Sequence, residues 1–366
     1  MKFLECITLN PKIYLEKGKI YSFIEMSNVS TNYRNPIAIE KKAFDSGVKF
    51  QDGDTIVARI TPCLQNGKRF YCKDIGIGFG STEFLVFRPK DESVDNLYLY
   101  YFMKTDFINQ CMINSMTGAT GRQRVNNEVF KDIEVSFPNI DIQRKIGGIL
   151  SVYDDLIENN QKQIKLLEEA AQRLYKEWFV DLRFPGYEKA KIVDGVPEGW
   201  SRRKVTDFLE VKYGKDHKAL EDGDVPAYGS GGVIRKVKSI LYSGESILIP
   251  RKGSLNNIMY VTGDFWTIDT MFFSKPRMDN VLKYTYLFLK GIDMYSFNIG
   301  AAVPSMTVKI LDGIDILQPD EKTLLGFEKI MNPMFSKMGI LATQIEKVQQ
   351  TRDGLLPKLV NGEIEV

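Results

Sequence analysis

The stretches KDIEVSFP at residues 131–138 and DGIDILQP at residues 312–319 end on prolines that lie 181 positions apart (319 − 138 = 181). The same offset places Ile133 over Ile314, and it persists without a gap along the residues that follow. Self-similarity at a fixed offset indicates repeated structural units. One duplicated element is therefore predicted to end each half of the protein.

A long amphipathic helix is predicted after the proline in each half. From Ile146 to Trp178, apolar residues recur in steps of three and four, which is the spacing of one helix face. About 40 residues at a rise of 1.5 Å make a rod of roughly 60 Å. Two such stripes in one chain would bury each other most simply as a coiled coil. The residues predicted to pair the helices are Ile146, Ile149, Tyr153, Ile164, Leu167, Leu174, Trp178, Ile330, Met334, Ile345, Val348 and Leu355.

Three features of these helices stay open at this point. The second copy, from about Leu325 to Leu359, carries Pro333 and Gly339, so its first turns are expected to be broken or kinked. Asn160 lies near the stripe, where a polar residue can fix the register at some cost in stability, and a solvated Asn160 is the alternative. Each helix could also be an ordinary core helix of its own domain, although duplication and length favour a paired spacer.

The segments before the helices also correspond, since residues 52–68 can be laid over residues 243–257 with one inserted residue. Short alternating runs of β-branched and aromatic residues, separated by Gly, Asn and Asp, predict small mixed domains dominated by antiparallel strands. The predicted fold class is α+β, with two β-rich globular domains separated by two long helices. The predicted boundaries are 1–138 for the first globular domain, 139–183 for the first helix, 184–319 for the second globular domain and 320–366 for the second helix.

The composition limits the classes of protein to consider. Of the 366 residues, 43% are hydrophobic, which is ordinary for a globular chain that folds without disulfides. A net charge of +2 does not by itself indicate a polyanion partner, so any basic surface must be local. Neither a signal peptide nor a membrane span of roughly 20 apolar residues is found, so a cytoplasmic location is expected. The four cysteines are Cys6, Cys63, Cys72 and Cys111. They lack CxxC spacing, which indicates free thiols and no metal site.

The loop ITPCLQNGK at residues 60–68 raises the question of whether Cys63 is a nucleophile. The corresponding loop RKGSLNN, residues 251–257, contains no cysteine, and the only histidine, His217, lies in the other half of the chain. A thiolate nucleophile needs a base or a strong positive field, so catalysis by Cys63 is not favoured. The two loops share Arg or Lys with Asn, Gln, Gly or Ser, which are residue types that pair with base edges and phosphates.

Two further basic clusters lie beside glycine-rich turns, GATGRQRVN at residues 118–126 and YGSGGVIRKVK at residues 228–238. Either cluster alone would usually be a solvated face. Their recurrence in corresponding parts of the two halves favours a shared role in binding a polyanion.

Motifs of stand-alone enzymes are missing. The sequence has no GxxxxGK[ST] loop, no HExxH and no GxSxG elbow. The carboxylate pairs Asp154-Asp155 and Glu168-Glu169 fall on the first long helix, where they are predicted to be solvated or interfacial rather than acid/base partners. No methyltransferase or nuclease centre is therefore predicted in this chain.

Several motifs occur in a specific order across the two halves. They are ARITPCLQNGK and GSTEFLVFRP, then FPNIDIQRKIGGIL running to LYKEWF, then VPEGW, PAYGSGGV, LIPRKGSLNN and LLPKLVNGEI. In this order, and over essentially the whole chain, the sequence resembles the specificity (S) subunit of type I restriction–modification systems. No single motif is unique to that family, but the order is highly specific.

This resemblance implies a non-catalytic subunit. Its two globular domains would be target-recognition domains, each reading one half of a bipartite, asymmetric double-stranded DNA target. Its helices would pack as an antiparallel coiled coil with pseudo-twofold internal symmetry, set the gap between half-sites and dock two methyltransferase (M) subunits. S-adenosylmethionine, and ATP with Mg for restriction, would belong to the M subunits and to the restriction/translocase (R) subunits, with no cofactor bound by this chain.

Carried over by position, the resemblance places DNA contacts in the loops described above. Arg251 and Lys252 are expected to attract phosphates, and Gln65 and Asn256 are expected to read adenine edges. Two alternatives remain open: a two-module coiled-coil scaffold without sequence-specific DNA binding, and a stand-alone enzyme built around Cys63 or the helix carboxylates. The predicted DNA-binding residues are Gln65, Asn66, Lys68, Arg122, Arg124, Ser230, Arg235, Lys236, Arg251, Lys252 and Asn256.

Overall fold

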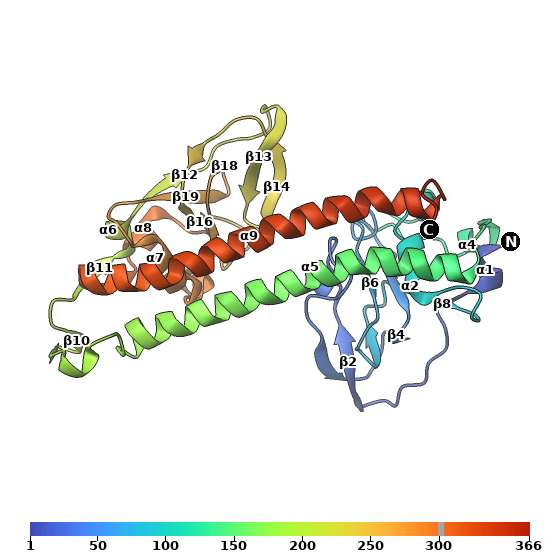
Figure 1. The fold of residues 1–366 in the computed structure, drawn as a ribbon, viewed down its shortest axis with the longest axis horizontal. Coiled ribbons are helices and arrows are strands. Elements are labelled where there is room, and N and C mark those ends of the chain that lie inside the picture. Colours follow the sequence, from blue (N-terminus) through green and yellow to red (C-terminus); the bar gives the residue numbers. More distant parts are fainter. Residues whose placement is uncertain (299–303) are drawn as a thin grey trace. The chain divides into compact units, whose positions relative to one another are not determined.

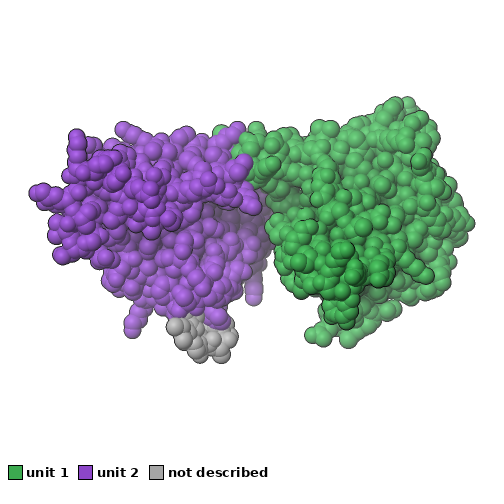
Figure 2. Space-filling view, turned by 90° about the horizontal axis from the view of Figure 1, so that it is seen from below, with its two compact units in different colours: residues 1–163, 340–366 green, residues 164–339 purple. Residues whose placement is uncertain are grey.

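The computed structural model describes residues 1–298 and 304–366, which form two compact units (Figure 2). Unit 1 comprises residues 1–163 and 340–366, and unit 2 comprises residues 164–339. Each unit contains one globular domain and one stretch of each long helix. The two long helices are therefore shared between the units.

Unit 1 is built on two four-stranded sheets (Figure 1). One has the order β1-β8-β5-β6 and is antiparallel, and the other has the order β3-β2-β7-β4 with a parallel β2–β7 pair. The strands are β1 (Ile7–Leu9), β2 (Ile20–Ile24), β3 (Glu40–Ala43), β4 (Val48–Gln51), β5 (Thr55–Ala58), β6 (Arg69–Tyr71), β7 (Ile77–Gly80) and β8 (Phe84–Pro89). The short helices are α1 (Phe3–Cys6), η1 (Met26–Asn28), α2 (Asn96–Phe102), α3 (Asp106–Asn114) and α4 (Val129–Asp132).

Unit 2 repeats this topology. Its sheets have the orders β12-β19-β16-β17 and β14-β13-β18-β15, with a parallel β13–β18 pair, beside two-stranded sheets β10–β9 and β11–β20. The same strand order in both units confirms the predicted internal repeat. The strands are β9 (Ile192–Val193), β10 (Val196–Pro197), β11 (Ser201–Lys204), β12 (Leu209–Tyr213), β13 (Asp222–Gly229), β14 (Gly232–Val237), β15 (Tyr242–Ser243), β16 (Ser246–Pro250), β17 (Met259–Val261), β18 (Asp264–Thr267), β19 (Met271–Pro276) and β20 (Asp315–Gln318). The shorter helices are η2 (Lys176–Val180), η3 (Tyr187–Lys189), α6 (Val205–Phe208), α7 (Leu282–Lys290), η4 (Met294–Asn298) and α8 (Val308–Asp312).

The long helices α5 (Ile140–Tyr175) and α9 (Glu321–Val360) begin at repeat-equivalent N-caps. The Asn139 side chain accepts a hydrogen bond from the backbone N–H of Ile142 (3.0 Å), and Asp320 accepts one from Thr323 (2.9 Å). Such a side chain satisfies a backbone donor that the first helical turn leaves free. Asn139 and Asp320 are 181 positions apart, so the duplication extends to the helix start signals.

Helix α9 is continuous through Pro333 and Gly339, so the expected break is absent. A proline inside a helix removes one hydrogen bond and crowds the preceding turn. Met331 and Phe335 on either side of Pro333 are buried in the core of unit 2, while Pro333 itself is exposed. Packing on both sides of the proline therefore holds the helix together.

Within unit 1, α5 and α9 pack antiparallel. Ile146 of α5 shares a core with Leu356 of α9, and Asn160 further along α5 donates a hydrogen bond to Gln344 (3.4 Å), so numbers rise along one helix as they fall along the other. This confirms the predicted antiparallel pairing. Asn160 is 3% exposed, so it is buried against α9 and not solvated.

The predicted helix-pairing residues differ in burial. Ile146, Trp178 and Ile345 are buried, whereas Ile149 and Ile330 are 37% and 41% exposed. The stripe is centred one residue away from these two, on Leu150 and Met331, which are both fully buried. The remaining predicted residues are half-buried: Tyr153, Ile164, Leu167, Leu174, Met334, Val348 and Leu355.

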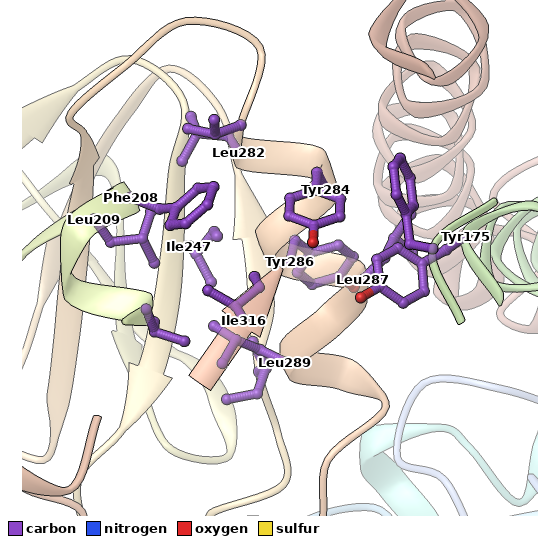
Figure 3. Packing of buried hydrophobic residues seen from close by; sticks show 14 of the residues in the cluster. Tyr175, Phe208, Leu209, Ile247, Leu282, Tyr284, Tyr286, Leu287, Leu289 and Ile316 are labelled. Atoms are coloured by element: carbon purple, nitrogen blue, oxygen red, sulfur yellow. The ribbon is translucent and has the colours of Figure 1, made fainter. Parts of the chain in front are cut away.

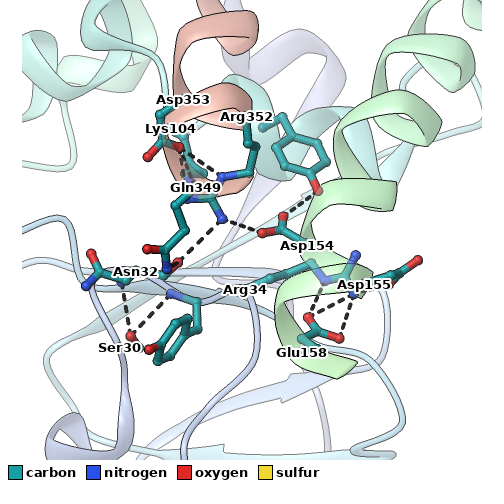
Figure 4. A network of polar contacts seen from close by, with 12 residues as sticks. Ser30, Asn32, Arg34, Lys104, Asp154, Asp155, Glu158, Gln349, Arg352 and Asp353 are labelled. Carbon is teal, nitrogen blue, oxygen red and sulfur yellow. Dashed lines mark hydrogen bonds and ion pairs between the residues drawn. The ribbon is translucent and has the colours of Figure 1, made fainter. Parts of the chain in front are cut away.

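A buried polar network ties the globular part of unit 1 to both helices (Figure 4). The guanidinium of Arg352 on α9 forms an ion pair with Asp154 on α5, and these residues are 2% and 0% exposed. Tyr101 of α2 donates its hydroxyl to the same carboxylate (2.5 Å). Burial, reinforced by Asp154, raises the pKa of Tyr101, so the phenol keeps the proton that it donates. Asp154 is therefore interfacial, which is one of the two predicted roles.

A second contact of this kind comes from the segment between β2 and β3. The Arg34 guanidinium is 2% exposed and bonds to Asp155 (2.5 Å) and Glu158 (2.9 Å), both on α5. Only the guanidinium is buried, since the side chains of Asp155 and Glu158 are 54% and 24% exposed, and a buried cation is retained where it is paired and hydrogen-bonded. The segment that contains Arg34 is thereby fixed to the first long helix.

In unit 2 the contact between the long helices and the globular part is made by aromatic side chains (Figure 3). Tyr175 at the end of α5 faces Tyr284 of α7 with ring centroids 5.6 Å apart, and Phe179 in η2 lies 4.6 Å from Tyr284. Phe327 of α9 lies 4.9 Å from Phe179 and 5.6 Å from Trp178. Edge-to-face aromatic pairs add to the free energy of simple area burial. One apolar cluster thus joins both helices to the globular part of unit 2.

Candidate functional site

In unit 1 the two loops predicted from sequence lie side by side. Thr61 and Gln123 exchange hydrogen bonds, from the Thr61 N–H to the Gln123 carbonyl and from the Gln123 N–H to the Thr61 hydroxyl, each 3.0 Å. The Val125 N–H also donates to the Arg59 carbonyl (2.9 Å). We call residues 59–68 and 117–125 the unit 1 loop pair. Residues some sixty positions apart in the chain therefore form one continuous surface.

The predicted residues of the unit 1 loop pair fall into two groups. Gln65, Asn66 and Arg122 are exposed. Lys68 instead donates to the carbonyl of Met26 (2.7 Å), and Arg124 pairs with Glu83 (2.6 Å). The first group is available to a ligand, whereas the second is held by the protein itself.

The Glu83–Arg124 pair affects the charge of this surface. Hydrogen bonding from Arg124 lowers the pKa of the Glu83 carboxyl below its ordinary value, so Glu83 remains ionised. An ionised carboxylate repels phosphate and offsets the charge of Arg124. A contact between Arg124 and DNA therefore requires that this pair open or that Arg124 share its donors.

A buried arginine that the sequence analysis missed supports the loop. Arg69, 4% exposed, donates from Nε to the Gly67 carbonyl (3.3 Å), from one terminal nitrogen to the Met103 carbonyl and from the other to Asn109 Oδ1 (2.6 Å). No ion pair of Arg69 occurs among residues 1–298 and 304–366. These bonds fix the 61–68 loop to the α2–α3 region. Its place as the first residue of β6, next to a turn, gives no signal of this role in the sequence.

Replacing Arg69 with methionine is expected to loosen the 61–68 loop. The loop would lose its fixed attachment to the α2–α3 region, and hydrogen bonds from charged donors are each worth about 1.5–3 kcal/mol. We expect amide hydrogen exchange in the loop to become faster by on the order of tenfold, as measured by mass spectrometry of the full chain. Arg122→Met, on the exposed neighbouring loop, is the matched control. Equal exchange in both variants would show that Arg69 does not hold the loop.

In unit 2, the predicted residues of the 251–257 loop lie beside Ser230. The Asn257 side chain donates to the Ser230 carbonyl (2.8 Å), and the Met306 N–H donates to the Arg251 carbonyl (2.8 Å). We call residues 251–257 with Ser230 and residues 305–306 the unit 2 loop cluster. Lys252 is exposed in this cluster and forms a β-bridge with Ser305.

Three predicted residues of unit 2 are engaged within the protein or lie elsewhere. The Asn256 amide donates to Asp293 (2.9 Å) and accepts from the Met294 N–H (2.7 Å), so both of its polar atoms are occupied. Arg235 forms an ion pair with Asp222 (2.5 Å). Lys236 lies beside Arg235 on β14. An adenine contact from Asn256 therefore needs its amide to be released first.

The two basic clusters do not occupy equivalent positions. By the offset of 181, residues 118–124 correspond to residues 299–305, most of which lie outside the described residues. The hairpin β13–β14, which carries Arg235, corresponds instead to β2–β3, where Lys41 and Lys42 are exposed. The predicted correspondence between the two basic clusters is wrong, because short glycine-rich motifs are too unspecific to align two segments by sequence alone. Sheet order decides the alignment.

The comparisons with known proteins agree with this architecture. The protein-family model described as "Type I restriction modification DNA specificity domain" matches residues 5–169 and 197–350, once in each half. The chain belongs to this DNA specificity family. The predicted family, its fold class and the role of a type I restriction–modification specificity subunit are thereby confirmed.

Two curated relatives and one solved structure resemble this specificity subunit. The type I restriction enzyme MjaIX specificity subunit of Methanocaldococcus jannaschii is 28% identical over 311 residues, 76% of this chain and 71% of that protein. The EcoEI specificity subunit of Escherichia coli is 28% identical over 205 residues, 54% of this chain but only 34% of its own length. The crystal structure of the type I restriction–modification S subunit from M. genitalium shares the fold, with a TM-score of 0.57, 19% identity and coverage of 98% and 95% of the two chains.

Three further features concern the cysteines, the helices and possible metal ligands. All four cysteines are free, as predicted, and Cys63 is half-buried beside the exposed Gln65. Within the described ranges, no helix is both long and apolar enough to cross a membrane. The same residues hold no cluster of three or more His, Cys, Asp or Glu side chains that could bind a metal ion.

Proposed function

We propose that each unit of this specificity subunit reads one half of a bipartite, asymmetric double-stranded DNA target. Unit 1 would read through its loop pair and unit 2 through its loop cluster. The observation that supports this proposal is that one scaffold presents a corresponding loop in each unit with different side chains. Equivalent scaffolds with unlike loops suit two unlike half-sites, because base edges are distinguished by side-chain donors and acceptors.

The proposed DNA contacts fall into two groups, exposed side chains and side chains that are bonded within the protein. Gln65, Asn66 and Arg122 in unit 1 and Lys252 in unit 2 are exposed and contact DNA first in this proposal. The engaged residues would contribute after local rearrangement or by fixing the loops. They are Lys68, Arg124, Arg235 and Asn256.

The long helices would set the spacing between half-sites. The length of a helix is fixed by its rise of 1.5 Å per residue, and α5 and α9 are both continuous. Antiparallel pairing with buried polar contacts, such as Asn160 with Gln344, specifies one register. A change in helix length would therefore alter the spacing without altering either half-site.

The proposed partners are two methyltransferase (M) subunits and, through the complex, the restriction/translocase (R) subunits. A groove of about 830 Å³ in unit 2 is lined by Lys176, Phe179 and Val180, and a groove of about 310 Å³ in unit 1 is lined by their counterparts at an offset of 181, Pro357, Val360 and Asn361. Grooves at corresponding positions of the two units suit two copies of one partner. In this proposal S-adenosylmethionine, ATP and Mg are bound by the partners, and this chain performs no reaction.

Single-molecule sequencing of genomic DNA tests the proposed function. Cells that express this chain with the methyltransferase subunit of its complex would be compared with cells that lack only this chain. We expect N6-methyladenine at one bipartite motif, which would give the target and its spacer together. Methylation of the same sites without this chain, or no marked motif with an assembled and active complex, would refute the specificity role. The non-catalytic scaffold would then become the better hypothesis.

A further inference from the structure

Arg59 of unit 1 occupies the same place as Arg251 of unit 2. Each is the first residue after the buried inner strand of its antiparallel sheet, β5 or β16. The N–H of Arg59 donates to the Glu83 carbonyl (2.9 Å), and that of Arg251 donates to the Thr270 carbonyl (2.8 Å). Sequence analysis singled out Arg251 but not Arg59.

The carbonyls of the two arginines are also matched. The Arg59 carbonyl accepts from Val125, and the Arg251 carbonyl accepts from Met306 at nearly the same distance. Val125 and Met306 are separated by the repeat offset (306 − 125 = 181). The backbone of both arginines is therefore held in the same frame, with hydrogen bonds on both sides.

The two guanidinium groups have similar surroundings. A terminal nitrogen of Arg59 donates to the Val125 carbonyl (3.3 Å), and one of Arg251 donates to the Asp269 carbonyl (2.6 Å). Arg251 also lies over the rings of Tyr213 (4.7 Å) and Phe272 (5.2 Å). Both side chains are half-buried, and among the described residues the buried Nε of each has no hydrogen-bond partner. Each stem is therefore held in place by the protein.

Neither guanidinium is held in an ion pair by a described residue, and Arg59 is attracted only through space to the ionised Glu83. Across residues 1–298 and 304–366, Arg59 and Arg251 form no ion pair, in contrast to Arg124 with Glu83 and Arg235 with Asp222. A guanidinium that is anchored by a carbonyl but lacks an anion is pre-oriented for one, and phosphate is an anion that arginine binds well. The residue after each arginine, and the residue paired with it across a β-bridge, differ between the units: Ile60 with Arg124 in unit 1 and Lys252 with Ser305 in unit 2.

We propose that Arg59 and Arg251 are equivalent phosphate anchors, each holding the DNA backbone at its own half-site while the unlike neighbouring residues read the bases. This proposal rests on the proposed function. Phosphate contacts fix the register of a protein on DNA and carry no sequence information. An identical arginine beside unlike loops is the arrangement that such a division of roles requires.

The test uses the complex of the full chain with its methyltransferase partner. Binding to the cognate duplex and to an unrelated duplex is measured by fluorescence anisotropy across a range of salt concentrations, for Arg59→Ala, Arg59→Lys and Arg251→Ala. We expect each alanine variant to bind both duplexes on the order of tenfold more weakly. The slope of log affinity against log salt should become shallower by about 0.9 for each phosphate that the variant no longer neutralises. Arg59→Lys should keep most of the slope.

Two controls separate this role from other effects. Lys131→Ala in unit 1 and Arg277→Ala in unit 2 remove an exposed positive charge outside the unit 1 loop pair and the unit 2 loop cluster, and should leave the slope unchanged. Thermal unfolding of each variant identifies any that fails to fold. A weakening confined to the cognate duplex with an unchanged slope would overturn the anchor role and assign the arginines to loop positioning.

The anchor inference and the proposed function fail in distinguishable ways. If the unaltered complex does not prefer its cognate duplex, the specificity role itself fails. If that preference is present and Arg59→Ala and Arg251→Ala bind as tightly as the unaltered complex with the same slope, only the anchor inference fails.

Discussion

Replacing Arg352 with alanine is expected to lower the free energy of unfolding of the chain by about 3–5 kcal/mol. The substitution removes the cation beside the Asp154 carboxylate, which stays buried at 0% exposure and still accepts the Tyr101 hydroxyl. An uncompensated buried charge is strongly destabilising, because the protein interior cannot replace the water that was removed. Urea denaturation of the full chain, followed by circular dichroism, measures the change.

Two further variants make this prediction specific. Arg173→Ala breaks an exposed pair with Glu169 on α5 and should cost at most about 0.5 kcal/mol. The double variant Arg352→Met with Asp154→Leu removes both charges and should be less destabilised than Arg352→Ala. If Arg352→Ala loses no more stability than Arg173→Ala, the buried pair does not lock α9 to α5.

Replacing Phe327 with alanine is the second large expected effect, also about 3–5 kcal/mol. Phe327 is 0% exposed and packs against the rings of Tyr175, Trp178 and Phe179 at centroid distances of 6.5, 5.6 and 4.9 Å. Truncation removes apolar burial and leaves a cavity at the junction of α5, α9 and the globular part of unit 2. The same denaturation experiment measures the decrease in stability.

Leu325→Ala is the matched control for Phe327. It lies two residues earlier on α9 and is 42% exposed, so its truncation should change stability by no more than about 0.5 kcal/mol. Comparable decreases in the two variants would mean that the aromatic cluster does not carry the junction. A decrease at Phe327 alone would establish that it does.

Much of the fold could be predicted because its signals are local. The offset of 181 and the apolar stripe located both long helices, and the Asn139 and Asp320 caps lie close to their predicted starts. The centre of the stripe was less certain, since Ile149 and Leu150 are both apolar and only Leu150 is fully buried. Adjacent apolar residues cannot be ranked by periodicity alone.

The candidate site was predictable only in part. The loops around Gln65 and Asn256 were found from residue types beside turns. In the structure the first loop is hydrogen-bonded to the predicted loop that contains Gln123, and the second is hydrogen-bonded to Ser230. Arg59 was missed because one arginine at a strand end carries no pattern. Its significance comes from the matching hydrogen bonds of Arg251 in the other unit.

By itself, the sequence determined the duplication, the two long helices, the class of the globular domains and the family, because these depend on spacing and order along the chain. Only the tertiary structure decided which cations are free. Arg34 meets Glu158, Arg124 meets Glu83 and Arg352 meets Asp154 across 124, 41 and 198 positions. Coulombic and hydrogen-bonding partners are chosen by proximity in space, and no local sequence pattern encodes that proximity.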